Sequence, residues 1–204
     1  DSVFTDIGDM TAIPDRLAQL LDVSVYNASM GGTCAARLET ERRLDSAKGS
    51  LSLVGLTGAI RSGDFDVQQT ARIRDSNTES FPEIIDGLAE VDFGQVEVAV
   101  IQKGVNDYHG GVPIDNEEDP YDEYTFLGAL RSAVRDLRSV NPHIRILFIT
   151  PTYTWYTATG LTCEETDNGA GVLEDYVNAQ LGLAEELGVE AIDLYHDFFP
   201  HESW

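Results

Sequence analysis

The sequence predicts a doubly wound α/β fold in which a mostly parallel β-sheet lies between helices. Short apolar runs rich in β-branched residues recur along the chain, amphipathic stretches separate them, and polar segments containing glycine or asparagine follow several runs. Near-continuous apolar runs are typical of strands covered on both faces, as in a parallel sheet. Strands that alternate with helices indicate the doubly wound class, with three layers in the order α/β/α.

Four runs bounded by turn residues are predicted to be strands: Val23 to Ala28, Val96 to Gln102, Ile144 to Thr150 and Val189 to Tyr195. Amphipathic spacing predicts the intervening helices: Ile13 to Leu21, Tyr124 to Val140 and Val172 to Leu187. The stretch from Leu44 to Asp92 is less periodic. We expect it to be an insertion with short helical pieces near Val67 to Arg74 and Pro82 to Val91.

Length and charge narrow the functional classes. A chain of 204 residues with 42% hydrophobic content suits one domain, residues 1–204. Its 36 acidic and 13 basic residues give a formal charge of −23, which opposes binding to nucleic acids and anionic lipid surfaces. We expect a soluble chain, because no apolar run approaches the ~20 residues of a membrane-spanning helix. A cytoplasmic location is slightly favoured, and secretion is expected if a signal segment precedes Asp1.

No cofactor and no metal are predicted. Cys34 and Cys163 lie far apart and form no CxxC pair, so we expect two buried thiols, with a single disulfide as the alternative. Residues 115–123 carry six acids but lack the spacing and central glycine of a calcium-binding EF loop, and a solvated surface loop is expected. The phosphate-binding patterns GxxxxGK and GxGxxG do not occur, which argues against a flavodoxin-like nucleotide-binding protein.

Ligands bind outside the carboxyl ends of the strands in sheets of this kind. The segments that follow the predicted strands are therefore the candidate site, and they are Ser29 to Thr33, Gly104 to Asp107 and Pro151 to Trp155. The opening residues Asp1 to Asp6 join them if a strand precedes Asp1. We expect all four segments to share one edge of the sheet.

These segments resemble the sequence blocks of the SGNH, or GDSL, hydrolases. Asp1-Ser2 followed by Gly8-Asp9 is similar to the first block, Asn27 to Thr33 is similar to the second, and Gly104 to Asp107 matches the GxND of the third. Order and spacing agree with the family over essentially the whole chain. The G-x-S-x-G elbow of the larger α/β-hydrolases is absent, so the SGNH-like arrangement is preferred.

The resemblance implies three catalytic positions. Ser2 is the nucleophile, and its own N–H, the N–H of Gly32 and the side-chain amide of Asn106 hold the oxyanion. Elementary chemistry agrees with these residue types, because a serine hydroxyl needs a neighbouring base and the charge that develops on the carbonyl oxygen needs fixed donors. Glycine lets the backbone approach that oxygen closely.

The acid and the base of such a triad come from a DxxH block. Asp193-Leu194-Tyr195-His196 satisfies this pattern literally, and Asp193 and His196 are candidates on that ground. The run around Asp193 is also similar to the strand that precedes the block in the family. We therefore expect that a first strand lies before Asp1 and that the DxxH segment lies after Trp204.

Three other histidines are weaker candidates for the base. His201 lies near the end of the sequence, His109 lies in the loop after GxND, and His143 follows Asn141-Pro142 at a helix end. For His143 a capping or surface role is the simpler interpretation.

The function expected from the resemblance is hydrolysis of a carboxylic ester through an acyl-Ser2 intermediate. A small-molecule or carbohydrate ester is the expected substrate, with removal of acetyl from a carbohydrate as a specific hypothesis. Aromatic residues near the strand ends suit stacking on a sugar or ordinary packing: Tyr108, Tyr121, Tyr153, Trp155 and Tyr156. The alternative is a non-catalytic ligand-binding module of the same fold. The sequence does not define the acyl group or the oligomeric state.

Overall fold

The structure is a computed structural model that describes residue 4 and residues 12–38, 49–71 and 81–198 of the chain. Within these residues, three parallel strands form a sheet in the order β1-β2-β3: Val98–Gln102, Arg145–Ile149 and Glu190–Ile192. The register pairs Ile101 with Phe148 and Ile149 with Ile192. Parallel neighbours require crossover connections, and helices supply them here.

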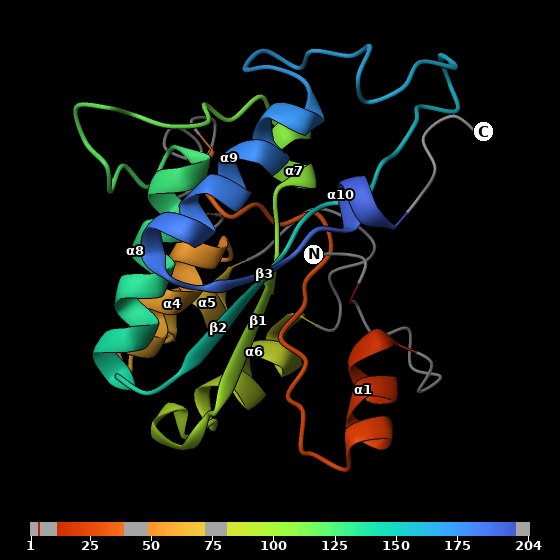
Figure 1. Ribbon diagram of the computed structural model, residues 1–204. Coiled ribbons are helices and arrows are strands. Elements are labelled where there is room, and N and C mark those ends of the chain that lie inside the picture. Colours follow the sequence, from red (N-terminus) through yellow and green to blue (C-terminus); the bar gives the residue numbers. More distant parts are fainter. Residues whose placement is uncertain (1–3, 5–11, 39–48, 72–80, 199–204) are drawn as a thin grey trace.

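The described helices lie on both sides of this sheet. In chain order they are α1 (Ile13–Leu21), α4 (Leu53–Ser62), α5 (Asp66–Thr70), α6 (Phe81–Ala89), α7 (Val105–His109), α8 (Phe126–Val140), α9 (Leu173–Leu187) and α10 (Leu194–Asp197), and a 3₁₀ turn, η2 (Phe93–Gln95), precedes β1. Figure 1 shows α4, α8 and α9 on one side of the sheet and α1 on the other. This is the predicted three-layer α/β/α arrangement.

The core lies between the sheet and helices α4, α8 and α9. Phe126 and Leu130 of α8, Phe148 of β2 and Tyr176 of α9 are fully buried in one cluster. Burial of such side chains contributes roughly 1.5–3 kcal/mol each. The opposite sheet face is more open among the described residues, since Val98 and Val100 of β1 are exposed.

The three long amphipathic helices are confirmed within two residues at each end. α1 spans the predicted residues, whereas α8 begins at Phe126 and α9 at Leu173. The delay at α8 follows from its cap, because the Thr125 hydroxyl accepts a hydrogen bond from the N–H of Gly128 and so starts the helix after Thr125. The sequence pattern predicted which residues face the core but not the residue at which the helix begins.

One helix in the predicted insertion was missed. α4 begins after Ser52, whose hydroxyl accepts from the N–H of Gly55, and it ends at Gly63 in the left-handed conformation. Gly55 lowers helix propensity but is required by packing, since a Cβ there would meet the backbone oxygen of Ser50 at 2.4 Å. α5 and α6 match the two short helical pieces that were predicted.

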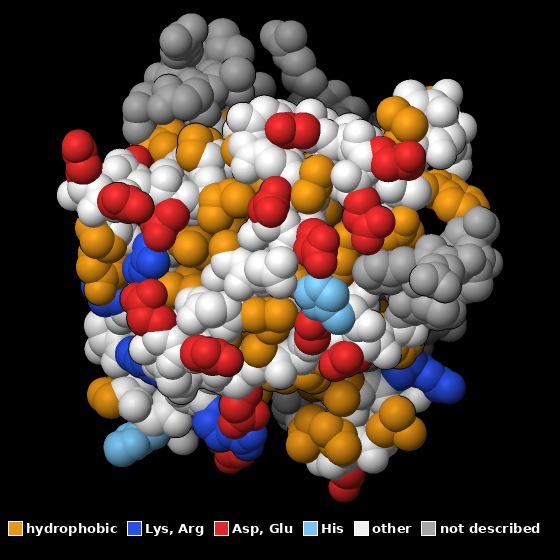
Figure 2. Space-filling model, turned by 45° about the horizontal axis from the view of Figure 1, so that its top comes forward, with side chains coloured by type: hydrophobic (Ala, Val, Ile, Leu, Met, Phe, Trp, Pro, Cys, Tyr) orange, Lys and Arg blue, Asp and Glu red, His pale blue; other side chains and the backbone are white. Residues whose placement is uncertain are grey.

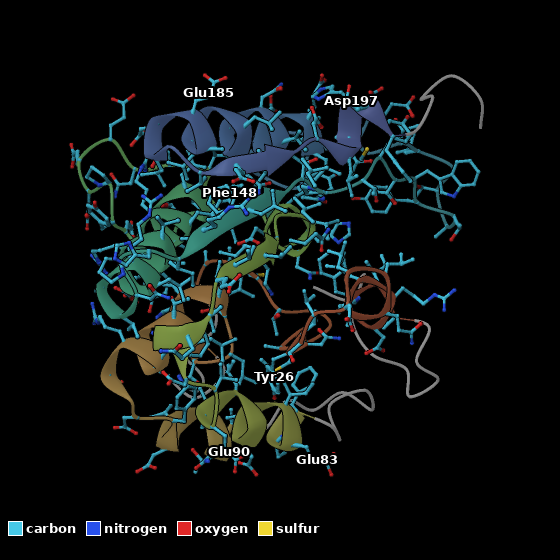
Figure 3. All side chains as sticks on the ribbon, turned by 60° about the horizontal axis from the view of Figure 1, so that its bottom comes forward. Tyr26, Glu83, Glu90, Phe148, Glu185 and Asp197 are labelled. Carbon is cyan, nitrogen blue, oxygen red and sulfur yellow. The ribbon has the colours of Figure 1, made fainter. Side chains whose placement is uncertain are left out.

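One strand prediction was wrong in the described residues, and another strand is shorter than predicted. Residues 23–28 are extended but join no ladder there, and Tyr26 instead donates its hydroxyl hydrogen to the Ile84 carbonyl at 2.6 Å. Figure 3 shows Tyr26 lying against α6. The last strand stops at Ile192 because the Asp193 side chain accepts hydrogen bonds from the N–H groups of Tyr195 and His196 and caps α10.

Among the described residues, no helix combines the length and the apolar character needed to cross a membrane. Cys34 and Cys163 are both buried cysteines, as expected.

Candidate active site

The carboxyl ends of the three strands meet at one edge of the sheet. Gly104 follows β1, Pro151 follows β2 and Asp193 follows β3, as Figure 1 lets the reader trace. The segment that contains Gly32 joins this edge, because Lys103 and Asn106 both donate to the carbonyl of Thr33. The described parts of the predicted segments therefore come together.

We call the first group of these residues the donor half: Gly32, Thr33, Lys103, Asn106 and Asp107. Asn106 Nδ2 lies 3.2 Å from the Thr33 carbonyl oxygen, one residue after Gly32. This contact uses one N–H of the carboxamide and fixes which end of the side chain is the donor. The second N–H of Asn106 is then left as a donor for a ligand.

Lys103 supports the donor half from inside the protein. Its ammonium is buried and donates to the Thr33 hydroxyl at 2.6 Å and to the Thr33 carbonyl at 2.9 Å. Burial lowers the pKa of Lys103, and the nearby Asp107 carboxylate opposes that effect. A lysine is rarely buried without partners, so both hydrogen bonds are needed for Lys103 to occupy this position.

Asp107 clamps the next part of the same loop. Its carboxylate accepts hydrogen bonds from the N–H of Ala35 at 2.9 Å and from the N–H of Ala36 at 2.9 Å. Burial raises the pKa of Asp107, and the two N–H groups and Lys103 act against this. Residues 33–36 are thus bound by three side chains near the end of β1 and the start of α7: Lys103, Asn106 and Asp107.

Gly104 shapes the turn between β1 and α7. Its φ of +128° lies in a region that favours glycine, and a Cβ would come within 3.0 Å of Pro151. Gly32 also has a positive φ, +74°, but open space surrounds its Cβ position. The turn after β1 can therefore pack directly against the turn after β2.

The second group, the base half, consists of Thr150, Asp193 and His196. Asp193 Oδ2 lies 2.6 Å from Nδ1 of His196, and Oδ1 accepts the N–H groups that begin α10. One carboxylate therefore both caps a helical turn and binds a histidine on that turn. The spacing of three residues places the imidazole beside the carboxylate.

Thr150 fixes this arrangement from the end of β2. Its hydroxyl is buried, donates to Asp193 Oδ1 at 3.2 Å, and accepts the N–H of Leu194 at 2.8 Å. A threonine at this position thus holds the acid and the start of α10 together.

Asp193 and His196 shift one another's pKa in opposite directions. The hydrogen bond to Asp193 raises the pKa of His196, burial opposes it, and a second carboxylate, Glu174, adds to the rise. Burial alone would raise the pKa of Asp193, but the backbone N–H and the imidazole of His196 outweigh it and lower that pKa. With Nδ1 bound to Asp193, Nε2 is the nitrogen left for proton transfer.

The other residues predicted from the sequence lie partly outside the described residues and partly near the carboxyl edge. Ser2 and His201 lie outside the described residues. Asn27 donates to the carbonyl of Phe4 at 2.7 Å, which brings the backbone two residues beyond Ser2 to the segment that leads to Gly32. His109 is exposed beside the rings of Tyr108 and Tyr156.

His143 lies at the other end of the sheet, just before β2. It therefore does not join the carboxyl edge.

Sequence reasoning missed two supporting residues. Lys103 immediately precedes the GxND pattern, and Thr150 is the last residue of an apolar strand run. A polar side chain at the end of a buried strand was the available signal in both cases.

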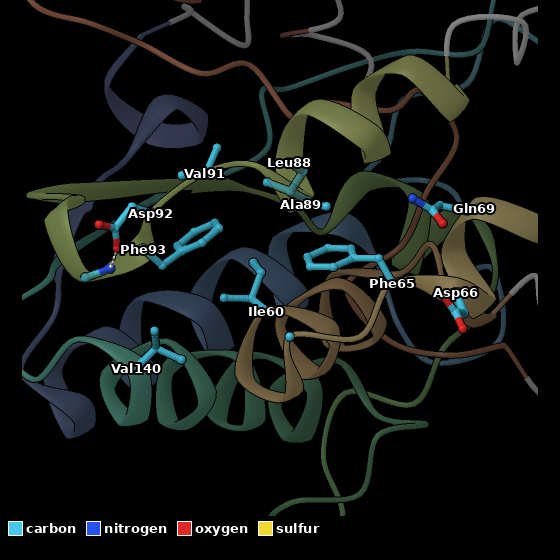
Figure 4. Close-up of a pocket in the computed structure, with 12 residues that line it drawn as sticks. Ile60, Phe65, Asp66, Gln69, Leu88, Ala89, Val91, Asp92, Phe93 and Val140 are labelled. Atoms are coloured by element: carbon cyan, nitrogen blue, oxygen red, sulfur yellow. Dashed lines mark hydrogen bonds between the residues drawn. The ribbon is translucent and has the colours of Figure 1, made fainter.

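A hollow of about 370 Å³ lies away from this edge. Ile60, Phe65, Leu88 and Phe93 line it, and Figure 4 shows their side chains facing a common space. Phe93 lies in η2, which precedes β1, so the hollow is at the amino end of the strands. It is separate from the donor half and the base half.

Acidic side chains crowd the face at the carboxyl edge. Figure 2 shows Asp and Glu spread over this face, while Lys and Arg lie towards its left and lower margins. Exposed members include Glu164, Glu165 and Asp167 in the segment between β2 and α9. Among the described residues, no cluster of three or more His, Cys, Asp or Glu side chains is arranged to hold a metal ion.

A parallel sheet with helices on both sides and polar residues at the carboxyl edge defines a three-layer α/β/α fold of the hydrolase type. The chain belongs to the GDSL-like lipase/acylhydrolase family, whose sequence model matches residues 4–204. The resemblance drawn from the sequence blocks is confirmed.

Two solved structures share this fold. A protein from Chitinophaga pinensis DSM 2588, described as a possible lipase, has a TM-score of 0.56 and 21% identity over 92% of this chain and 59% of its own length. A protein from Lactobacillus plantarum has a TM-score of 0.62 and 21% identity over 97% of this chain and 74% of its own. This chain therefore spans little more than half of the Chitinophaga pinensis protein. None of the curated proteins matches this chain.

Proposed function

We propose that this chain is a serine ester hydrolase, with Ser2 as nucleophile, His196 as general base and Asp193 as the acid that orients the base. Membership of the GDSL-like lipase/acylhydrolase family supports an ester hydrolase in general. The observation that carries the proposal is the 2.6 Å contact between Asp193 and Nδ1 of His196, at the same sheet edge as Asn106. Such a pair leaves Nε2 to receive a proton, as a hydrolytic triad requires.

In the first half of the reaction, the Ser2 hydroxyl oxygen attacks the ester carbonyl carbon and its proton passes to Nε2 of His196. The carbonyl oxygen becomes an oxyanion, which the N–H groups of Ser2 and Gly32 and the amide of Asn106 stabilise. One such donor lowers the barrier by about 3 kcal/mol. The intermediate then collapses, the alcohol leaves with the proton from Nε2, and an acyl-Ser2 ester remains.

In the second half, water attacks the acyl-Ser2 carbonyl and gives its proton to Nε2. Collapse of the new intermediate returns that proton to Ser2 and releases the carboxylic acid. Asp193 remains ionised throughout and stabilises each imidazolium that forms. The two half-reactions together consume one ester and one water and require no oxidant, metal or cofactor.

The substrate class that we propose is a neutral ester with a short acyl group, such as an acetylated carbohydrate. Two observations support it. Tyr153 and Trp155 follow β2, and residue Trp155 is 47% exposed, which suits stacking on a sugar face. The acidic face at the carboxyl edge disfavours substrates that carry negative charge.

Covalent labelling tests the proposed nucleophile. We expect a fluorophosphonate probe to label Ser2 in the full chain, and Ser2→Ala to abolish both the label and hydrolysis of p-nitrophenyl acetate. Ser24→Ala, at an exposed serine outside the candidate site, is the matched control and keeps both. His196→Ala is expected to lower kcat/KM about 100- to 10,000-fold. A folded chain that neither takes the label nor hydrolyses the ester would instead be a ligand-binding module.

A further inference from the structure

His196 has a second carboxylate partner. Oε1 of Glu174, in the first turn of α9, lies 3.3 Å from Nε2 of His196, while Asp193 occupies Nδ1. The side chains of His196 and Glu174 are 35% and 44% exposed, so this contact forms where water has access. It is therefore weaker than the buried contacts of the donor half and can open.

The nitrogen that Glu174 contacts determines which protonation state of His196 the contact favours. A carboxylate only accepts hydrogen bonds at neutral pH, so Glu174 binds Nε2 when that nitrogen carries a hydrogen. Asp193 requires a hydrogen on Nδ1 in the same way. Both contacts together select the imidazolium form of His196, and an imidazolium has no lone pair with which to take a proton from Ser2.

The two charged groups that contact the imidazole both raise its pKa, against the lowering effect of burial. Asp193 and Glu174 are the charged groups that raise the pKa of His196, with the Asp193 hydrogen bond contributing most. The Tyr195 ring packs edge-on against the imidazole, with 5.0 Å between ring centroids, and carries no charge. The next residue, Asp197, adds another exposed acid on α10.

We propose that Glu174 is a positioning residue that occupies Nε2 of His196 in the resting enzyme and must release it before Ser2 can transfer its proton. Glu174 then competes with Ser2 for the base, and the competition is strongest at low pH, where the imidazolium predominates. This proposal rests on the proposed function, since it assigns His196 as the base. It makes Glu174 a residue that raises the lower pH limit of hydrolysis beyond the effect of Asp193.

An NMR titration tests the contact without any need for activity. The Hε1 resonance of His196 is followed against pH in the full chain and assigned by its loss in His196→Gln. We expect Glu174→Gln to move the titration midpoint of His196 to lower pH. Glu185→Gln removes the same charge from the far end of α9, as Figure 3 shows, and is expected to leave the midpoint unchanged.

The pH dependence of p-nitrophenyl acetate hydrolysis tests the competition. We expect the acidic limb of kcat/KM to move to lower pH in Glu174→Gln, so that this variant is about two- to fivefold faster than the parent on that limb. On the alkaline plateau the two are expected to converge. Glu185→Gln is expected to follow the parent at every pH.

The results separate this proposal from the proposed function. An unchanged His196 midpoint in Glu174→Gln, or equal shifts in Glu174→Gln and Glu185→Gln, would overturn the role of Glu174 even in an active enzyme. Parallel pH profiles for Glu174→Gln and the parent would overturn it as well. A shifted midpoint in a chain that lacks Ser2 labelling would leave the Glu174 contact established and the esterase assignment wrong.

Discussion

The donor half and the base half share one sheet edge but are held in opposite ways. Lys103 and Asp107 fix the donor half from positions that are at most 7% exposed. His196 in the base half is partly exposed and bound by two carboxylates that water can reach. Buried polar contacts are costly to break, whereas exposed ones exchange with solvent. The proposed oxyanion donors Gly32 and Asn106 are thus held by buried contacts, and the proposed base His196 is left free to respond to pH.

The largest expected effect on stability comes from a substitution in the donor half. Asp107→Ala removes the acceptor for the N–H groups of Ala35 and Ala36 and leaves the Lys103 ammonium without its carboxylate. We expect a loss of about 3–5 kcal/mol in the free energy of unfolding, measured by urea denaturation. Glu118→Ala in the exposed acidic loop is the control and is expected to change it by less than about 0.5 kcal/mol.

A double-mutant cycle sharpens this result. When Lys103→Met is combined with Asp107→Ala, the loss is expected to be smaller than the sum of the two single losses, because neither buried charge is then left alone. Strict additivity would show that Lys103 and Asp107 act independently.

Thr150 links the buried core to the base half, so its effect is expected to be intermediate. Thr150→Val keeps the shape of the side chain but removes the donor to Asp193 and the acceptor for the N–H of Leu194. We expect a loss of about 1–3 kcal/mol in the free energy of unfolding and a fall in kcat with little change in KM. Thr150→Ser retains the hydroxyl and is expected to recover most of kcat. A Val variant with full activity would rule out a role for Thr150 in orienting the acid.

The smallest expected effect is the pH dependence of stability at His196. Because its pKa is raised in the folded chain, its stabilisation is complete below the ordinary histidine pKa and is lost as pH rises through the raised value. The stability lost in His196→Gln is therefore expected to be greater at about pH 5.5 than at about pH 8.5, by less than about 1 kcal/mol for a partly exposed pair.

His109 provides a control of opposite sign. The neighbouring rings bury part of the largely exposed imidazole, and this partial burial lowers the pKa of His109. Protonation therefore favours the unfolded chain, and the contribution of His109 to stability falls as pH drops. His109→Gln is expected to gain stability relative to the parent at the lower pH. The same slope for both histidine variants would contradict the assignment of the two environments.

The long helices and three of the four strands were predictable, because amphipathic spacing marks the helices and continuous apolar runs mark the strands. Helix α4 was not, since Gly55 and Gly58 weaken its local pattern and its stability comes from packing against α8. Residues 23–28 have strand-like composition, but composition does not supply a hydrogen-bonding neighbour. The cap at Asp193 also overrode an apolar run that continued to Tyr195.

The candidate site was partly predictable for a related reason. Gly32 and Asn106 could be placed at the sheet edge from short motifs at strand ends, and the structure connects them through Thr33. The contact between Asp193 and His196 depends on β3 ending at Ile192, so that Asp193 can cap α10. The apolar run alone does not predict this end point. The contact of Glu174 in α9 with Nε2 of His196 in α10 joins two residues that lie 22 positions apart in the sequence, and no local pattern encodes it.

The acidic face around the strand ends has a consequence for turnover. In the proposed reaction a neutral ester gives a carboxylate, so the product gains a negative charge on a protein whose own formal charge is −23. Mutual repulsion then hastens departure of the acid and keeps it from returning to the site. The hydrolase should therefore resist inhibition by its own acid product, and added salt should weaken that resistance because the Debye length is only about 8 Å at 0.15 M ionic strength.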